Sequence, residues 1–165
     1  MAGRWYTATS NLVSYTTTTL TPVMAGSATT TAPFDIACVR IGFHAAGSTS
    51  TFPTSASVLC QLSRTTGAIG GGSAITARIA PHNTTDPASN AGYLYDASSA
   101  GITGLTQGVN LWSEPLPFSA GSNWAEWVSP GSEWRISANT TFALFVTASA
   151  AGTLTDVAAE LVWVE

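Results

Sequence analysis

The stretch FDIACVRIGF, residues 34–43, is apolar at nearly every position and shows no helical repeat. A short run of this kind, rich in β-branched and aromatic side chains, predicts a strand that is covered on both faces. Outside it, no segment longer than two helical turns repeats apolar residues at helical spacing. The chain continues instead as short β-branched and aromatic runs between clusters of Gly, Pro, Asn and Ser, which predicts an all-β fold.

The other runs have the length and spacing of strands in a two-sheet fold. They cover residues 5–9, 12–20, 58–63, 109–112, 124–128, 134–137, 141–148 and 154–164. We therefore expect a jelly-roll-like antiparallel β-sandwich of about eight strands, formed as a single domain by residues 1–165. The stretch 64–108 is expected to be a long, loop-rich surface excursion, with order at 78–80 and 93–96.

Charged residues make up only 8% of the chain, against about 25% in an average soluble domain. There is no lysine, and the five arginines are scattered singly, so nothing predicts a nucleic-acid partner. No run of 18 apolar residues predicts a membrane span, and the N-terminal stretch MAGRWYTATS lacks the apolar core of a signal peptide. We expect synthesis in the cytoplasm, and buried free thiols at Cys38 and Cys60.

The chain has too few catalytic and metal-binding groups to predict such a site. We therefore expect that it is not an enzyme and that it binds no cofactor and no metal. His82 and Asp86 would supply only two ligands, whereas a specific metal site needs three or four. A glycoside hydrolase needs two facing carboxylates, for which Glu114, Glu126 and Glu133 are the only candidates. The Gly-rich stretch GAIGGGS, residues 67–73, has no phosphate-loop ending and is interpreted as a turn.

Aromatic residues gather between positions 112 and 134, where two interpretations stay open. Aromatic rings can stack on sugars, so the stretch could form a carbohydrate-binding platform. Alternatively, some rings belong to the core and others anchor a protein partner, since Trp and Tyr are enriched in interfaces. The residues concerned are Trp112, Phe118, Trp124, Trp127 and Trp134.

Four patches of the chain resemble a family of small structural proteins of tailed bacteriophages. They are the opening MAGRWYTAT, the strand ending RIGF at 40–43, the segment LSRTTGAIGGGSAITARIAPHNTTDPA at 62–88, and the close ELVWVE at 160–165. Members of this family carry a short aromatic leader, a Gly-rich turn before a Pro- and Asp-containing loop, and a last strand ending in an acidic residue. The Trp-rich stretch from Trp112 to Trp134 departs from that pattern, and the family has no catalytic residues to carry over.

The resemblance implies a virion protein on the capsid surface, most simply a decoration (cement) protein that binds the major capsid protein and stabilises subunit contacts. A self-associating homotrimer is expected, because closed rings suit sites of local threefold symmetry. The alternative is a minor tail or fibre-associated protein that binds host carbohydrate. The expected interface anchors are Trp5, Tyr6, Trp124, Trp127 and Trp134.

Overall fold

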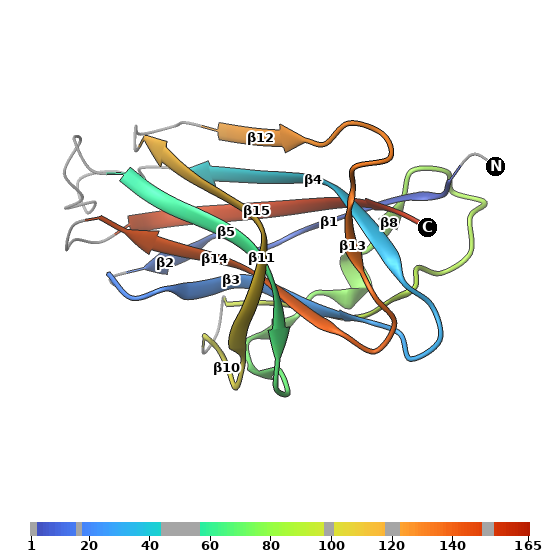
Figure 1. Cartoon of the computed structure of the whole chain (residues 1–165), viewed down its shortest axis with the longest axis horizontal. Coiled ribbons are helices and arrows are strands. Elements are labelled where there is room, and N and C mark those ends of the chain that lie inside the picture. Colours follow the sequence, from blue (N-terminus) through green and yellow to red (C-terminus); the bar gives the residue numbers. More distant parts are fainter. Residues whose placement is uncertain (1–2, 16–17, 44–56, 98–100, 118–122, 150–153) are drawn as a thin grey trace.

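The protein is built from antiparallel β-sheets, as seen in a computed structural model that describes residues 3–15, 18–43, 57–97, 101–117, 123–149 and 154–165 (Figure 1). The all-β prediction is thus confirmed. Within the described residues the only helical element is a single 3₁₀ turn, η2 (Thr76–Arg78). The expectation of about eight strands is wrong, because the strands run from β1 to β15.

The first sheet, here called sheet A, has β4 and β15 at its centre. Its order is β12 (Asn123–Trp127), β4 (Phe34–Phe43), β15 (Leu154–Val164), β1 (Trp5–Thr9) and β8 (Ala80–Pro81). Two further short strands join it, β13 (Trp134–Ile136) beside β4 and β2 (Val13–Tyr15) beside β15. Because β1 pairs with β15 in the antiparallel sense, the start of β1 and the end of β15 lie at the same end of the molecule (Figure 1).

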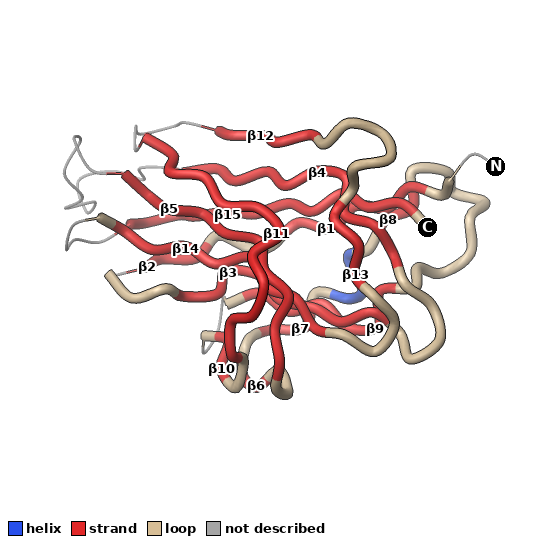
Figure 2. The backbone as a smooth tube through the Cα atoms, in the orientation of Figure 1, coloured by secondary structure: helices blue, strands red, loops and turns tan. Residues whose placement is uncertain are grey.

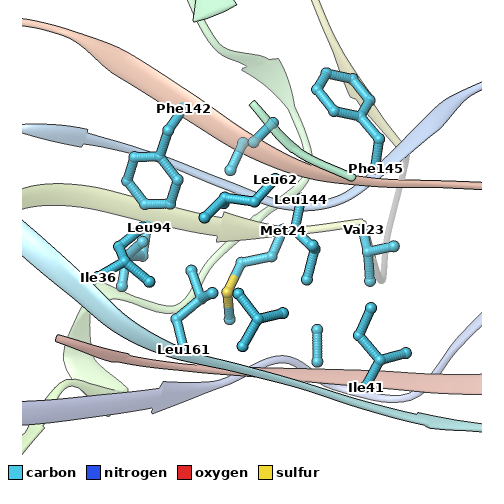
Figure 3. Close-up of a cluster of buried hydrophobic side chains, with 14 of the residues drawn as sticks. Val23, Met24, Ile36, Ile41, Leu62, Leu94, Phe142, Leu144, Phe145 and Leu161 are labelled. Atoms are coloured by element: carbon cyan, nitrogen blue, oxygen red, sulfur yellow. The ribbon is translucent and has the colours of Figure 1, made fainter. Parts of the chain in front are cut away.

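The second sheet, sheet B, faces sheet A across the core. Its order is β11 (Thr106–Pro117), β5 (Ser57–Thr66), β14 (Thr141–Ala148), β3 (Thr21–Ala28), β9 (Ala91–Asp96) and β7 (Ser73–Ala74). Leu62, Leu144 and Met24 project from it towards Ile41 and Leu161 of sheet A (Figure 3). The apolar side chains of the two sheets therefore form one hydrophobic cluster between them, the arrangement of a sandwich.

The stretch between β5 and β11 is more ordered than a loop-rich excursion. Thr65 and Thr66 pair with β11, so the connection spans only residues 67–105. It contains the small sheet of β6 (Gly70–Gly71) and β10 (Ile102–Thr103), which lies beyond the ends of β5 and β11 (Figure 2). Its other strands extend the two large sheets, β8 at the edge of sheet A and β7 with β9 at the edge of sheet B.

The excursion is held against the rest of the chain by hydrogen bonds to two terminal residues. The Tyr6 hydroxyl donates to the Pro87 carbonyl at 2.8 Å. A carboxylate oxygen of Glu165 accepts from the Ser89 hydroxyl at 2.6 Å and from the Asn90 amide at 2.7 Å. These contacts all lie within one chain.

Strand β3 is the element that the sequence pattern missed. Among the described residues of the strand expected at 12–20, only β2 forms, and the next strand begins at Thr21. Pro22 and Gly26 interrupt the β-branched pattern by which strands are recognised. Yet Gly26 lies in the middle of sheet B, where a Cβ atom would stand 2.5 Å from a methyl of Leu94 and 2.9 Å from the ring of Phe142. A glycine is required there because the neighbouring side chains occupy the space of its side chain.

We therefore predict that Gly26→Ala lowers the free energy of unfolding by about 1–3 kcal/mol, the usual cost of overpacking a core. Urea denaturation of the two proteins measures the difference. Gly92→Ala is the matched control, because the nearest atom to a Cβ there is the Ser27 hydroxyl at 3.3 Å, which can rotate away, and the next neighbours stand at 3.5 Å. Equal stability of wild type and Gly26→Ala would contradict the steric argument.

Candidate interaction surface

The outer face of sheet A follows from its strand registers. Cys38 pairs with Val162 on one side and with Trp127 on the other, and all three side chains point away from the core. In the next outward row, Arg40 pairs with Glu160 and with Ala125. Large and charged side chains thus alternate with small ones on this face.

Trp127 is held in place by the charged row beside it. The Arg40 guanidinium lies over its indole ring, 5.4 Å from the ring centre. The same guanidinium donates to Glu160 at 2.6 Å, and Glu160 also accepts from the Thr9 hydroxyl at 3.3 Å. These partly exposed contacts each stabilise the fold by at most about 1 kcal/mol. Their effect is to fix the orientation of a ring that is 50% exposed.

A hollow of about 420 Å³ opens on this face next to the ion pair. Its floor is made by small residues, Gly42, Ala125 and Ala158, and Trp124 and Arg40 border it. A hollow on the same face as the exposed Trp127 ring can receive an apolar side chain of a partner protein.

Three of the five expected anchors lie at the surface of sheet A. Trp127 is described above; Trp5 is 36% exposed and stacks on His82, with ring centres 6.4 Å apart. Trp124 is 39% exposed at the sheet edge, on the opposite side of β12 from Trp127.

The other two expected anchors lie in the core or pack against it. Tyr6 is not at the surface as we expected. It is completely buried and stacks on Trp163, because its side chain lies on the face of β1 that points into the core. Trp134 packs against the core and lies 6.3 Å from Trp112, measured between ring centres. Within the described residues the tryptophans therefore form no single platform, and Phe118 lies outside those residues.

The candidate catalytic residues are dispersed, whereas the two candidate metal ligands, His82 and Asp86, line one hollow near Trp5. Glu114 lies in sheet B, Glu126 lies in sheet A, and Glu133 accepts from the Gly131 amide in the turn before β13. His82 lies against Trp5, and no group of three or more His, Cys, Asp or Glu among the described residues could hold a metal ion. Nor does any helix in the described part of the chain have the length and apolar character to cross a bilayer.

A second polar surface, on the outer face of sheet B, went unnoticed in the sequence. Ser63 donates to Asn110 at 2.7 Å, and the Gln107 amide donates to both Asn110 and Ser63 at 2.8 and 3.1 Å. At the opposite edge, Tyr93 is 63% exposed. The alternation of Tyr93 and Tyr95 with buried Leu94 and Asp96 was the available signal that Tyr93 faces outwards.

Comparison of the chain with protein families, with curated proteins and with solved structures gave no match. The arrangement of its own residues is therefore the basis for any functional assignment.

Both cysteines are free and buried, as the sequence predicted. Burial raises the pKa of Cys38 to about 11, although the neighbouring Arg40 guanidinium opposes that rise. Burial also raises the pKa of Cys60. At about pH 8 fewer than about one Cys38 thiol in a hundred is then ionised, and the thiolate is the reactive form.

We predict that Ellman's reagent at about pH 8 leaves both thiols of the folded protein unmodified and titrates both after unfolding in urea. The variant Cys60→Ala isolates the response of Cys38. Rapid release of one equivalent from this folded variant would show that Trp127 and Arg40 do not shield the Cys38 thiol.

Proposed function

We propose that the sandwich has the strand order of a jelly roll. The support is the nesting of its antiparallel pairs: β1 pairs with β15, β3 with β14, β4 with β12, and β5 with β11. The first strands of these pairs, β1, β3, β4 and β5, lie alternately in sheets A and B. A long hairpin wound around a barrel-like core has this arrangement. The short strands β6 to β10 are then an insertion between β5 and β11, which form the innermost pair.

We propose that the protein is a structural component of a tailed-phage virion, a capsid decoration protein that binds the major capsid protein as a homotrimer. The observation that carries the proposal is the outer face of sheet A, where Trp127 is oriented by Arg40 beside a hollow with a floor of small residues. An aromatic ring that is already fixed loses little side-chain entropy when a partner covers it.

Composition supports repeated packing of many copies. A formal net charge of −4 leaves little repulsion between neighbours, and the absence of lysine removes side chains that are costly to order. A specific protein contact buries roughly 1,200–2,000 Å² in total. Trp5 and Trp127 lie on the same face of sheet A with two strands between their own, which gives a contact area anchored near both edges.

The proposal predicts the copy number of the protein in purified virions. Quantitative mass spectrometry against the major capsid protein should give a ratio near one, or a simple fraction such as about one third, as binding at lattice positions requires. A handful of copies per particle would instead favour the tail or fibre assignment. Absence from the particle would overturn the virion assignment.

A second prediction tests the surface. Trp127→Ala should raise the dissociation constant for capsids stripped of the protein by at least about tenfold, because truncation of a central aromatic anchor typically costs about 2 kcal/mol or more. Co-sedimentation measures the change. Arg78→Ala and Tyr93→Ala are controls, since both side chains are exposed outside the outer face of sheet A. Equal losses in all three variants would remove the anchor role of Trp127.

A further inference from the structure

One corner of sheet B combines an exposed aromatic ring with a neutral hollow. The hollow measures about 420 Å³ and lies where β3, β9 and β14 meet the turns at 28–33 and 137–140. Its lining consists of hydroxyl, amide, aromatic and small groups and contains no carboxylate, guanidinium or imidazole. The residues that matter here are Ser27, Thr30, Gly92, Tyr93, Asn139 and Thr141.

Strand registers place Tyr93, Ser27, Thr141 and Thr65 in one row across the outer face of sheet B. Tyr93 pairs with Ser27, Ser27 with Thr141, and Thr141 with Thr65. Neighbouring strands lie about 4.8 Å apart, so three hydroxyl-bearing positions extend away from the tyrosine at regular intervals. At the end of the row, the Thr65 hydroxyl donates to the Thr141 hydroxyl at 2.8 Å, and the Thr141 hydroxyl donates to the Thr65 carbonyl at 2.9 Å.

The hydrogen-bonding groups nearest the hollow are available to a ligand. The hydroxyls of Ser27, Thr30 and Tyr93 and the side-chain amide of Asn139 make no hydrogen bond to any described part of the chain. They provide both donors and acceptors. A ligand that carries several hydroxyls could bond to them in place of water.

The wall of the hollow is rigid because its two turns are joined. The Asn139 amide nitrogen of the main chain donates to the Thr29 carbonyl at 2.9 Å, and the Ala28 nitrogen donates to the Thr140 carbonyl at 3.1 Å. Asn139 has a φ of 57°, the single positive value among described non-glycine residues. Asparagine tolerates this left-handed conformation better than most residues.

Gly92 keeps the hollow open. A Cβ atom at this position would lie 3.3 Å from the Ser27 hydroxyl, so a larger residue would crowd the row beside Tyr93. The ring of Tyr93 is itself supported by Tyr95, with ring centres 6.5 Å apart. A supported ring that is 63% exposed offers a flat apolar surface next to polar groups.

We propose that this hollow binds a neutral pyranose unit of a polysaccharide, with one sugar face on Tyr93 and its hydroxyls bonded to Ser27, Thr30 and Asn139. A sugar ring presents apolar C–H groups on its face and hydroxyls at its edge, which matches this arrangement. Phosphorylated or acidic glycans fit poorly, because no cationic group lines the hollow. The site lies on the other sheet from the tryptophan surface, and the proposal does not depend on the virion assignment.

The test applies the purified full chain to an array of glycans built from neutral hexoses, N-acetylhexosamines and deoxyhexoses, together with acidic glycans. Neutral glycans should bind, and the best of them should be titrated as a free oligosaccharide by NMR chemical shifts. Tyr93→Ala should weaken binding about tenfold, whereas Tyr93→Phe keeps the stacking ring and should weaken it by less than about threefold. Asn139→Gly keeps the left-handed backbone accessible and should weaken binding by removing the amide.

Trp127→Ala is the matched control, because it removes an exposed aromatic ring from sheet A and should leave glycan binding unchanged. Circular dichroism and thermal unfolding establish that each variant is folded. Silence of the array towards neutral glycans overturns the proposal. So does binding that survives Tyr93→Ala, or binding that is lost in Trp127→Ala, which would place the sugar on the tryptophan surface.

Discussion

The packing of Trp163 connects every part of this structure. Its buried indole stacks on Tyr6 with ring centres 6.0 Å apart, and it lies 5.7 Å from Phe34, whose own ring meets Phe142 of sheet B edge-on. Its ring nitrogen donates at 3.1 Å to Ser89 and to Glu165. One side chain therefore joins the first and last strands, both sheets and the excursion. A smaller residue at this position would leave a cavity and would remove one of the hydrogen bonds to Glu165, while those from Ser89 and Asn90 would remain.

The small number of charged residues determines which hydrogen-bond partners the other polar side chains have. The ion pairs of Arg40 with Glu160 and of Arg135 with Asp35 lie on the outer side of sheet A and are partly exposed. Sheet B instead carries hydroxyl and amide groups that bond to one another across its strands. The two outer faces therefore differ in chemistry: that of sheet A has aromatic rings among ion pairs, and that of sheet B is neutral and hydroxyl-rich.

Strands whose own residues carry the pattern could be predicted from the sequence, and β1, β4, β14 and β15 begin and end as expected. Strand β3 could not, because its defining residue is a glycine whose need for space arises from Leu94 and Phe142, which are distant in the sequence. In the candidate site, too, some features could be predicted from the sequence and others could not. Alternation predicts that adjacent residues of a strand face opposite sides, but only the pairing of β1 with β15 decides that Tyr6 is buried while Trp5 is exposed.

The positions of the two proposed surfaces have a consequence for how they would act together. They lie on outward sides of different sheets, separated by the thickness of the core, which is about 10 Å between sheets. A partner that covers Trp127 would leave the row from Tyr93 to Thr65 open to solvent, since no residue lines both hollows. Rigid packing between the sheets gives neither surface a means of closing the other. Occupation of one face by a protein lattice is therefore compatible with saccharide binding on the other, and repetition over a lattice would multiply a weak single-site affinity.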